Sequence, residues 1–219
     1  MLKAILFDMD NTLIDFTKLK LKSCEAAVDA MNLKNALPIL FEVYDKYGIE
    51  EQHIFEKFLL RIKGKIDYRT VARGVIAYRK AKEAYLKPFP NVIPTLLELR
   101  KKYKLAIISD APRINAWMRL VTTNLDEFFD MVITAADVRK TKAFSAPFRA
   151  ALRALKVSPN EAMMVGDRIE RDIKPAKALG IKTCYAKYGD QYTFSGMKKE
   201  PRQSGADMEI EDIQELRNL

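Results

Sequence analysis

The stretch MLKAILFDMDNTLID, Met1 to Asp15, decides the fold. Residues 2–7 form a short, mostly apolar run that stops at two acids, Asp8 and Asp10. A run of this length bounded by polar residues predicts a buried strand of a parallel sheet. Ligands of open α/β sheets bind beyond the carboxyl ends of the strands, so both acids are expected at a binding edge. Carboxylates this close need a cation, a shared proton or a phosphoryl group between them, unless they are two solvated turn residues.

Polar or basic residues also follow three later apolar runs. They are Ser109 and Asp110 after Lys104–Ile108, Arg139–Lys142 after Met131–Thr134, and Asp167 and Asp172 after Ala162–Val165. Each has an ordinary explanation, because Ser and Asp are common helix caps and most charged runs are solvated loops. Strands that alternate with helices nevertheless predict a doubly wound parallel sheet, which would bring these strand ends to one edge.

The region between residues 17 and 87 differs from the rest of the chain. Its apolar residues recur at helical spacing, with Gly48 and Gly64 as natural helix ends, and it shows little strand signal. This pattern predicts about four helices, the size of a small bundle. The sequence therefore predicts a core domain of residues 1–16 and 88–219, interrupted by an inserted helical domain of residues 17–87.

Composition excludes several classes of protein. The chain has 219 residues, 48% of them hydrophobic, and no apolar run long enough to span a membrane. The net charge is +9, but the basic residues are spread along the chain with acids nearby, so no nucleic-acid partner is expected. Cys24 and Cys184 have no metal-binding spacing, and His53 has no second ligand near it. Both thiols are expected to be reduced in a cytoplasmic protein.

Four segments together resemble the conserved motifs of the haloacid dehalogenase superfamily. They are DMDNT at 8–12, SD at 109–110, Lys142, and GDRIERD at 166–172. The resemblance implies a Rossmann-like α/β core, and it identifies the helical insertion with the C1 cap of that superfamily. Ala143 and Ser145 stand where the family usually has prolines, which is a departure after motif three. Dehalogenases of the family generally lack an acid at the position of Asp10, whereas its phosphatases and phosphomutases have one.

The resemblance also implies roles for the motif residues. Asp8 would attack phosphorus to form an aspartyl-phosphate, and Asp10 would act as general acid and base. Mg²⁺ is the expected cofactor, since it prefers carboxylates and phosphate oxygens. Its expected ligands are Asp8, Asp167, the backbone carbonyl of Asp10 and, directly or through a second layer of contacts, Asp172. The expected phosphate-binding residues are Ser109, Asp110 and Lys142.

The expected function is a Mg²⁺-dependent phosphatase. Its partner would be a small phosphorylated metabolite: a sugar, triose, glycolate or nucleotide monophosphate. A phosphomutase of the same superfamily would use the same residues and return the phosphoryl group to a substrate hydroxyl. Two further alternatives are a haloacid dehalogenase, which Asp10 argues against, and a phospho-receiver-like module, which would be shorter and would lack the helical insertion.

Overall fold

The computed structural model describes residues 1–193, 195–200 and 202–219. The chain divides into two compact units, an α/β unit and a helical unit. The α/β unit contains Met1–Asp15, Lys87–Gln191 and Lys199–Leu219, and the helical unit contains Phe16–Leu86 and Tyr192–Lys198. The segment Tyr192–Lys198 thus groups with the helices, although the sequence had placed it in the core. Phe194 and Pro201, which belong to the predicted core domain, lie outside the described residues.

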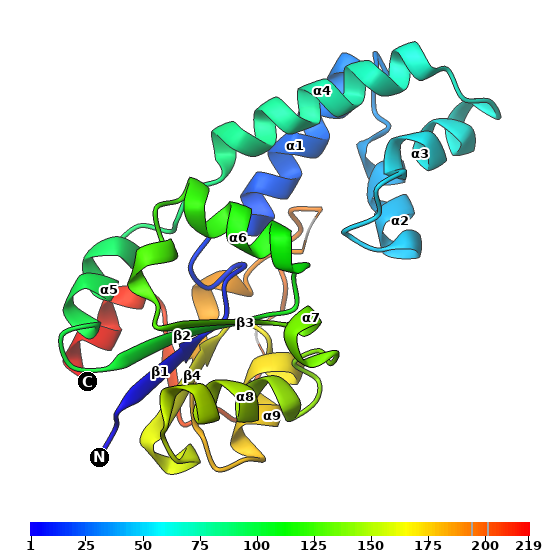
Figure 1. Cartoon of the computed structure of the whole chain (residues 1–219). Coiled ribbons are helices and arrows are strands. Elements are labelled where there is room, and N and C mark those ends of the chain that lie inside the picture. The colour runs from blue at the N-terminus through cyan, green and yellow to red at the C-terminus, as the bar shows by residue number, and fades with distance from the viewer. Residues whose placement is uncertain (194, 201) are drawn as a thin grey trace. The chain divides into compact units, whose positions relative to one another are not determined.

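The α/β unit is built on a parallel sheet (Figure 1). Its strands are β1 (Ala4–Phe7), β2 (Lys104–Ser109), β3 (Met131–Thr134), β4 (Ala162–Gly166), β5 (Lys182–Ala186) and β6 (Met208–Ile210). Their order in the described sheet is β3-β2-β1-β4-β5-β6, and every pairing is parallel. β1 lies between β2 and β4 with all four residues fully buried, as its apolar run predicts. The predicted doubly wound fold is confirmed.

Helices cover the sheet and connect its strands (Figure 1). They are α5 (Val92–Leu99), α6 (Arg113–Thr122), α7 (Ala135–Val138), α8 (Ala146–Leu155) and α9 (Lys174–Lys177). One hydrophobic core forms where Phe148, Ala151 and Leu155 of α8 pack with Leu6 of β1 and Ile108 of β2. Because strand side chains alternate between faces, Ile5 and Phe7 lie on the other side of the sheet.

Short helical turns complete the α/β unit. They are the 3₁₀ segments Asp126–Phe128, Pro159–Glu161, Lys187–Gly189 and Ile213–Asn218 and the π-helical segment Ile169–Ile173. Asp172 lies in the π turn just before α9. The last 3₁₀ segment has Asp212 as its N-cap, and the Asp212 side chain accepts from the backbone N–H of Gln214.

The helical unit contains α1 (Phe16–Ala30), α2 (Leu37–Tyr47), α3 (Ile54–Lys63) and α4 (Tyr68–Tyr85). Its core is made by apolar residues from all four helices, Phe58 and Leu59 of α3 being fully buried. The ends of the helices follow local rules. Asp67 caps α4 by accepting from the backbone N–H groups of residues 69 and 70, and Gly64 ends α3 in the left-handed conformation. Within the described residues, none of the helices has the length and apolarity needed to cross a membrane.

Candidate active site

The turn after β1 fixes the position of the first two acids. The backbone N–H of Asp8 donates to the carbonyl of Val165 in β4 at 2.9 Å, which anchors Asp8 beside the end of that strand. The chain then turns back, and the N–H of Asn11 donates to the carbonyl of Ile14 at 2.7 Å. Asn11 has φ +64°, a left-handed conformation that Asn adopts more readily than most residues. Asp8 and Asp10 are therefore held at the carboxyl edge of the sheet.

Three buried acids meet at this edge. Asp8, Asp167 and Asp172 each have a carboxylate oxygen within 4.8 Å of the other two, and their exposed fractions are 4%, 3% and 0%. Asp172 is held by the backbone N–H of Arg168, which donates to Oδ2 at 2.9 Å. Its carboxyl group also packs directly on Gly166, where an added Cβ would come within 2.4 Å of Asp172 Cγ. The glycine at the end of β4 thus makes room for the third acid.

Lys142 reaches into the same cluster from the loop before α8. Its Nζ contacts Asp8 Oδ1 and lies 2.7 Å from Asp172 Oδ1, and the side chain is 3% exposed. Burial by itself lowers the pKa of this ammonium group, but Asp172 and Asp8 outweigh it and hold the pKa above its usual value. Lys142 therefore carries a charge that offsets the repulsion among the acids.

One lysine does not fully compensate the burial and mutual repulsion of the three acids. Burial, followed by the charges of Asp8 and Asp172, raises the pKa of Asp167 well above its usual value. Burial likewise raises the pKa of Asp172 to about 6. Among the described residues, the buried Oδ1 of Asp167 has no hydrogen-bond partner. Mg²⁺ binds carboxylate oxygens at about 2.1 Å, so oxygens grouped this closely fit a single hard divalent cation.

The remaining predicted site residues lie near β2. Ser109, the last residue of β2, is buried, and its Oγ accepts from the N–H of Ala111 at 3.1 Å. Asp110 accepts from the backbone N–H of Lys142 at 2.7 Å and from the guanidinium of Arg171 at 2.8 Å. These contacts tie the loop that carries Lys142 to the end of β2. Phosphate binding by Ser109 and by Asp110 stays a prediction. The carboxylate of Asp110 is already engaged in holding the backbone of Lys142.

Sequence reasoning missed three residues that shape the edge. The guanidinium of Arg119, on α6, contacts the carboxylate of Asp10. Tyr188 donates its hydroxyl to the carbonyl of Thr12 at 2.6 Å and so supports the turn after β1. A Cβ on Gly189 would lie 1.9 Å from the carbonyl oxygen of Asn11. Of the three, only Arg119 is detectable in the sequence, because it is a charged residue on the same helix face as the apolar residues Ala116 and Leu120.

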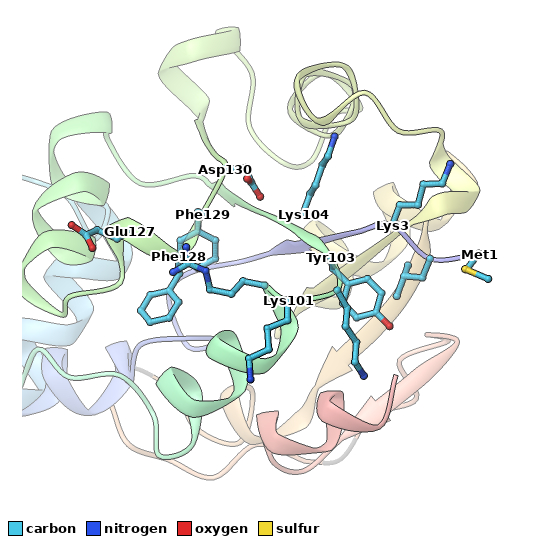
Figure 2. A pocket seen from close by; sticks show the side chains of 12 residues that line it. Met1, Lys3, Lys101, Tyr103, Lys104, Glu127, Phe128, Phe129 and Asp130 are labelled. Atoms are coloured by element: carbon cyan, nitrogen blue, oxygen red, sulfur yellow. The ribbon is translucent and has the colours of Figure 1, made fainter.

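A separate cleft of about 620 Å³ opens at the amino ends of β1, β2 and β3 (Figure 2). Lys3, Lys101 and Lys104 line it, but their side chains point in different directions and each has a local partner. Those partners are Glu161, Glu98 and the carbonyl of Leu155 respectively. The cleft is at the opposite end of the strands from Asp8, so it is distinct from the acid cluster.

Comparison with known families and proteins agrees with this geometry. The family model for haloacid dehalogenase-like hydrolases matches residues 5–186, which include every predicted site residue. The chain belongs to the haloacid dehalogenase-like hydrolases. It is 36% identical over 198 residues to a glyceraldehyde 3-phosphate phosphatase of Pyrococcus abyssi, covering 86% of this chain and 83% of that protein. A protein of the same name from Methanothermobacter thermautotrophicus is 30% identical and aligns over 100% of both chains.

Solved structures of haloacid dehalogenase-like hydrolases share the fold. A HAD phosphatase from Thermococcus onnurineus matches with a TM-score of 0.66 and 26% identity, over 99% of this chain and 97% of that one. YfnB from Bacillus subtilis, whose crystal structure is bound to magnesium, matches with a TM-score of 0.74 and 18% identity over the same shares. The second likeness concerns the fold alone.

Proposed function

We propose that this haloacid dehalogenase-like hydrolase is a Mg²⁺-dependent phosphatase of small phosphorylated metabolites. The observation that carries the proposal is the meeting of Asp8, Asp167, Asp172 and Lys142 at the carboxyl edge of the sheet. Asp10 lies on the same turn as Asp8, within reach of the same edge. The acid cluster with Lys142 would thus bind the metal and compensate the charge of the phosphoryl group, and Asp10 would transfer protons.

A phosphate monoester is anionic, so an anionic nucleophile can approach it only where positive charge and donors compensate the repulsion. Asp8, Asp167, Asp172 and the backbone carbonyl of Asp10 would hold Mg²⁺. The ion, when bound, supplies charge compensation for the phosphoryl group and for the acids around it. Lys142 adds a second positive charge, and the Ser109 hydroxyl can donate to a phosphoryl oxygen. Most of the catalysis is then positioning and electrostatic stabilisation.

The chemistry proceeds in two displacements. A carboxylate oxygen of Asp8 forms a bond to phosphorus as the bond from phosphorus to the ester oxygen breaks. The protonated carboxyl of Asp10 gives its proton to the departing oxygen. Asp10, now ionised, takes a proton from water as the water oxygen attacks phosphorus. The bond between phosphorus and Asp8 breaks, which releases inorganic phosphate and restores both carboxyl groups.

The first candidate substrate is glyceraldehyde 3-phosphate. Several relatives at 30–36% identity bear the name glyceraldehyde 3-phosphate phosphatase, and the alignment with one of them spans both chains completely. A pyrophosphatase PpaX of Bacillus cereus is 30% identical over 187 residues, so pyrophosphate is the second candidate. A small anionic substrate also suits the net charge of +9.

The decisive experiment measures phosphate release from glyceraldehyde 3-phosphate, pyrophosphate and glucose 1-phosphate, with Mg²⁺ and with a chelator. We expect Mg²⁺-dependent release, and we expect Asp8→Asn to lose at least about 10³-fold in kcat because the nucleophile is removed. Asp130→Asn is the matched control, since Asp130 lies at the amino end of the sheet and binds the N–H of Leu105. Isomerised sugar phosphate without free phosphate would instead establish a phosphomutase. Activity above a few per cent in Asp8→Asn would remove Asp8 from its role.

A further inference from the structure

Arg119 lies at a buried position of α6, where a charged side chain costs free energy of folding. The buried residues of α6 are Ala116, Arg119 and Leu120, at the spacing of an amphipathic helix. The Arg119 side chain is 3% exposed. Taking a guanidinium out of water costs several kcal/mol unless an opposite charge and hydrogen bonds compensate it. An apolar residue would fit this pattern better, so a specific interaction must account for the arginine.

One such interaction is with Asp10. The Nη1 atom of Arg119 contacts Asp10 Oδ2, and the Asp10 side chain is 23% exposed. A guanidinium is a rigid planar donor group, so it constrains the direction of a carboxylate more tightly than a lysine does. The backbone around Arg119 is itself fixed by the helix, because the backbone N–H of Thr123 donates to the Arg119 carbonyl at 3.1 Å. The second acid of the DMDNT motif is thus held from α6, a different element from the one that carries it.

We propose that Arg119 is a positioning residue that orients the carboxyl group of Asp10 toward the ester oxygen of the substrate. The proposal rests on the function proposed above, in which Asp10 protonates the departing oxygen. If Arg119 acts in this way, its importance depends on how strongly the leaving group of the substrate needs a proton. An alkoxide is a poor leaving group and needs the proton, whereas p-nitrophenolate is stable enough to depart without one. Arg119 should therefore matter for alkyl phosphates and hardly at all for p-nitrophenyl phosphate.

The test compares kcat/KM for glyceraldehyde 3-phosphate and p-nitrophenyl phosphate in Arg119→Met. This ratio reports the steps up to transfer of the phosphoryl group, so it isolates the protonation of the leaving group. General acids contribute about 10²–10⁴-fold, and we expect a loss of about 10- to 100-fold for glyceraldehyde 3-phosphate. For p-nitrophenyl phosphate we expect a loss below about threefold, because no general acid is needed there. Arg119→Lys keeps the charge and should recover part of the loss.

Two controls separate positioning from damage to the helix. Thr123→Val perturbs the same turn of α6 without touching Asp10, so both substrates should stay within about twofold of the original chain. In an Asp10→Asn background, Arg119→Met should change kcat/KM for glyceraldehyde 3-phosphate by less than about twofold, since the carboxylate that Arg119 orients has been replaced. Circular dichroism establishes folding, and Arg119→Gln replaces the methionine variant if that variant does not fold.

The outcomes are distinguishable. Equal losses on both substrates, or an undiminished effect in the Asp10→Asn background, would overturn the role of Arg119. A chain with its original sequence that releases no phosphate from either substrate would instead overturn the proposed function. A selective loss on the alkyl phosphate, absent from Thr123→Val, would establish the positioning role.

Discussion

Each unit of the molecule buries a lysine, and the two lysines have different surroundings. Lys142 in the α/β unit and Lys20 in the helical unit are both 3% exposed. Lys142 contacts the carboxylates of Asp8 and Asp172. Lys20 donates to the hydroxyl of Tyr78 at 2.9 Å and to the carbonyl of Ile49 at 3.2 Å, and its Nζ lies 3.7 Å from the centre of the Tyr44 ring.

The surroundings indicate different functions. The contacts of Lys20 join α1 to α4 and to the turn that precedes α3. The faces of the tyrosine rings stabilise the charge of Lys20, and none of the candidate catalytic residues is among these contacts. Lys142 lies where several acids would otherwise repel one another. A buried charge among carboxylates therefore marks the candidate active site, whereas a buried charge among tyrosines organises the packing of helices.

The strongest test of this contrast is Lys142→Met. The variant loses a charge that we expect to hold phosphoryl oxygens, and kcat should fall by about 10³-fold. Lys20→Met, an identical exchange in the other unit, should leave kcat within about threefold of the original chain. Steady-state phosphate release with saturating Mg²⁺ measures both. Similar losses in the two variants would mean that burial alone, and not the carboxylate partners, determines the effect.

A second comparison uses two glycines. A Cβ on Gly189 would lie 1.9 Å from the backbone oxygen of Asn11, whereas a Cβ on Gly74 of α4 would meet the flexible side chain of Met31, with its Sδ at 2.6 Å. Gly189→Ala must displace the turn that carries Asp8, and displacements of about 1 Å can cost about 10²-fold in rate. We expect that loss, with destabilisation by about 3 kcal/mol.

Gly74→Ala is the matched control for this added methyl group. Methionine can repack, and alanine gains about 1 kcal/mol of helix propensity, so the unfolding free energy should change by less than about 1 kcal/mol. Urea unfolding and phosphate release measure both variants. Unchanged activity in Gly189→Ala would show that the turn after β1 tolerates displacement.

The strand ends of the site were predictable because they are local patterns. β1 is a short apolar run that ends at Asp8, and β4 is another that ends before Asp167. Parallel pairing of β1 with β4 then places both acids at one edge without further information. The residue pattern alone did not distinguish Lys142 from Lys140. The choice came from the resemblance to the family, and the structure places Lys142 among the acids.

Contacts between distant elements were not predictable. Arg119 meets Asp10 across 109 positions of sequence, and Gly189 approaches Asn11 only because β5 delivers it there. Within one helix, apolarity alone does not predict burial, as α5 shows. Leu96 and Leu99 are buried, but Leu97 is 46% exposed because consecutive residues of a helix lie about 100° apart.

A smaller effect is expected at Asp110, which acts on Lys142 through the backbone. Asp110→Asn weakens the acceptor for the N–H of Lys142 and removes the ion pair with Arg171. The lysine loop has Ala143 and Ser145 in place of the usual prolines, so this tie should matter, and we expect kcat to fall about tenfold. Arg171→Met removes only the outer ion pair, whose arginine is 43% exposed, and should change kcat by less than about twofold. Equal losses would assign the effect to Arg171 and not to the loop.

The smallest expected effect concerns the stability of the helical unit in Lys20→Met. Methionine fills a similar volume and avoids the cost of burying a charge, but the hydroxyl of Tyr78 and the carbonyl of Ile49 lose their donor. These terms oppose each other, so we expect a net destabilisation of only about 1–2 kcal/mol, measured by urea unfolding. Adding Tyr78→Phe removes the hydroxyl that Lys20 contacts and should recover part of that loss. A Lys20→Met variant as stable as the original chain would show that the tyrosines accommodate the lysine without depending on it.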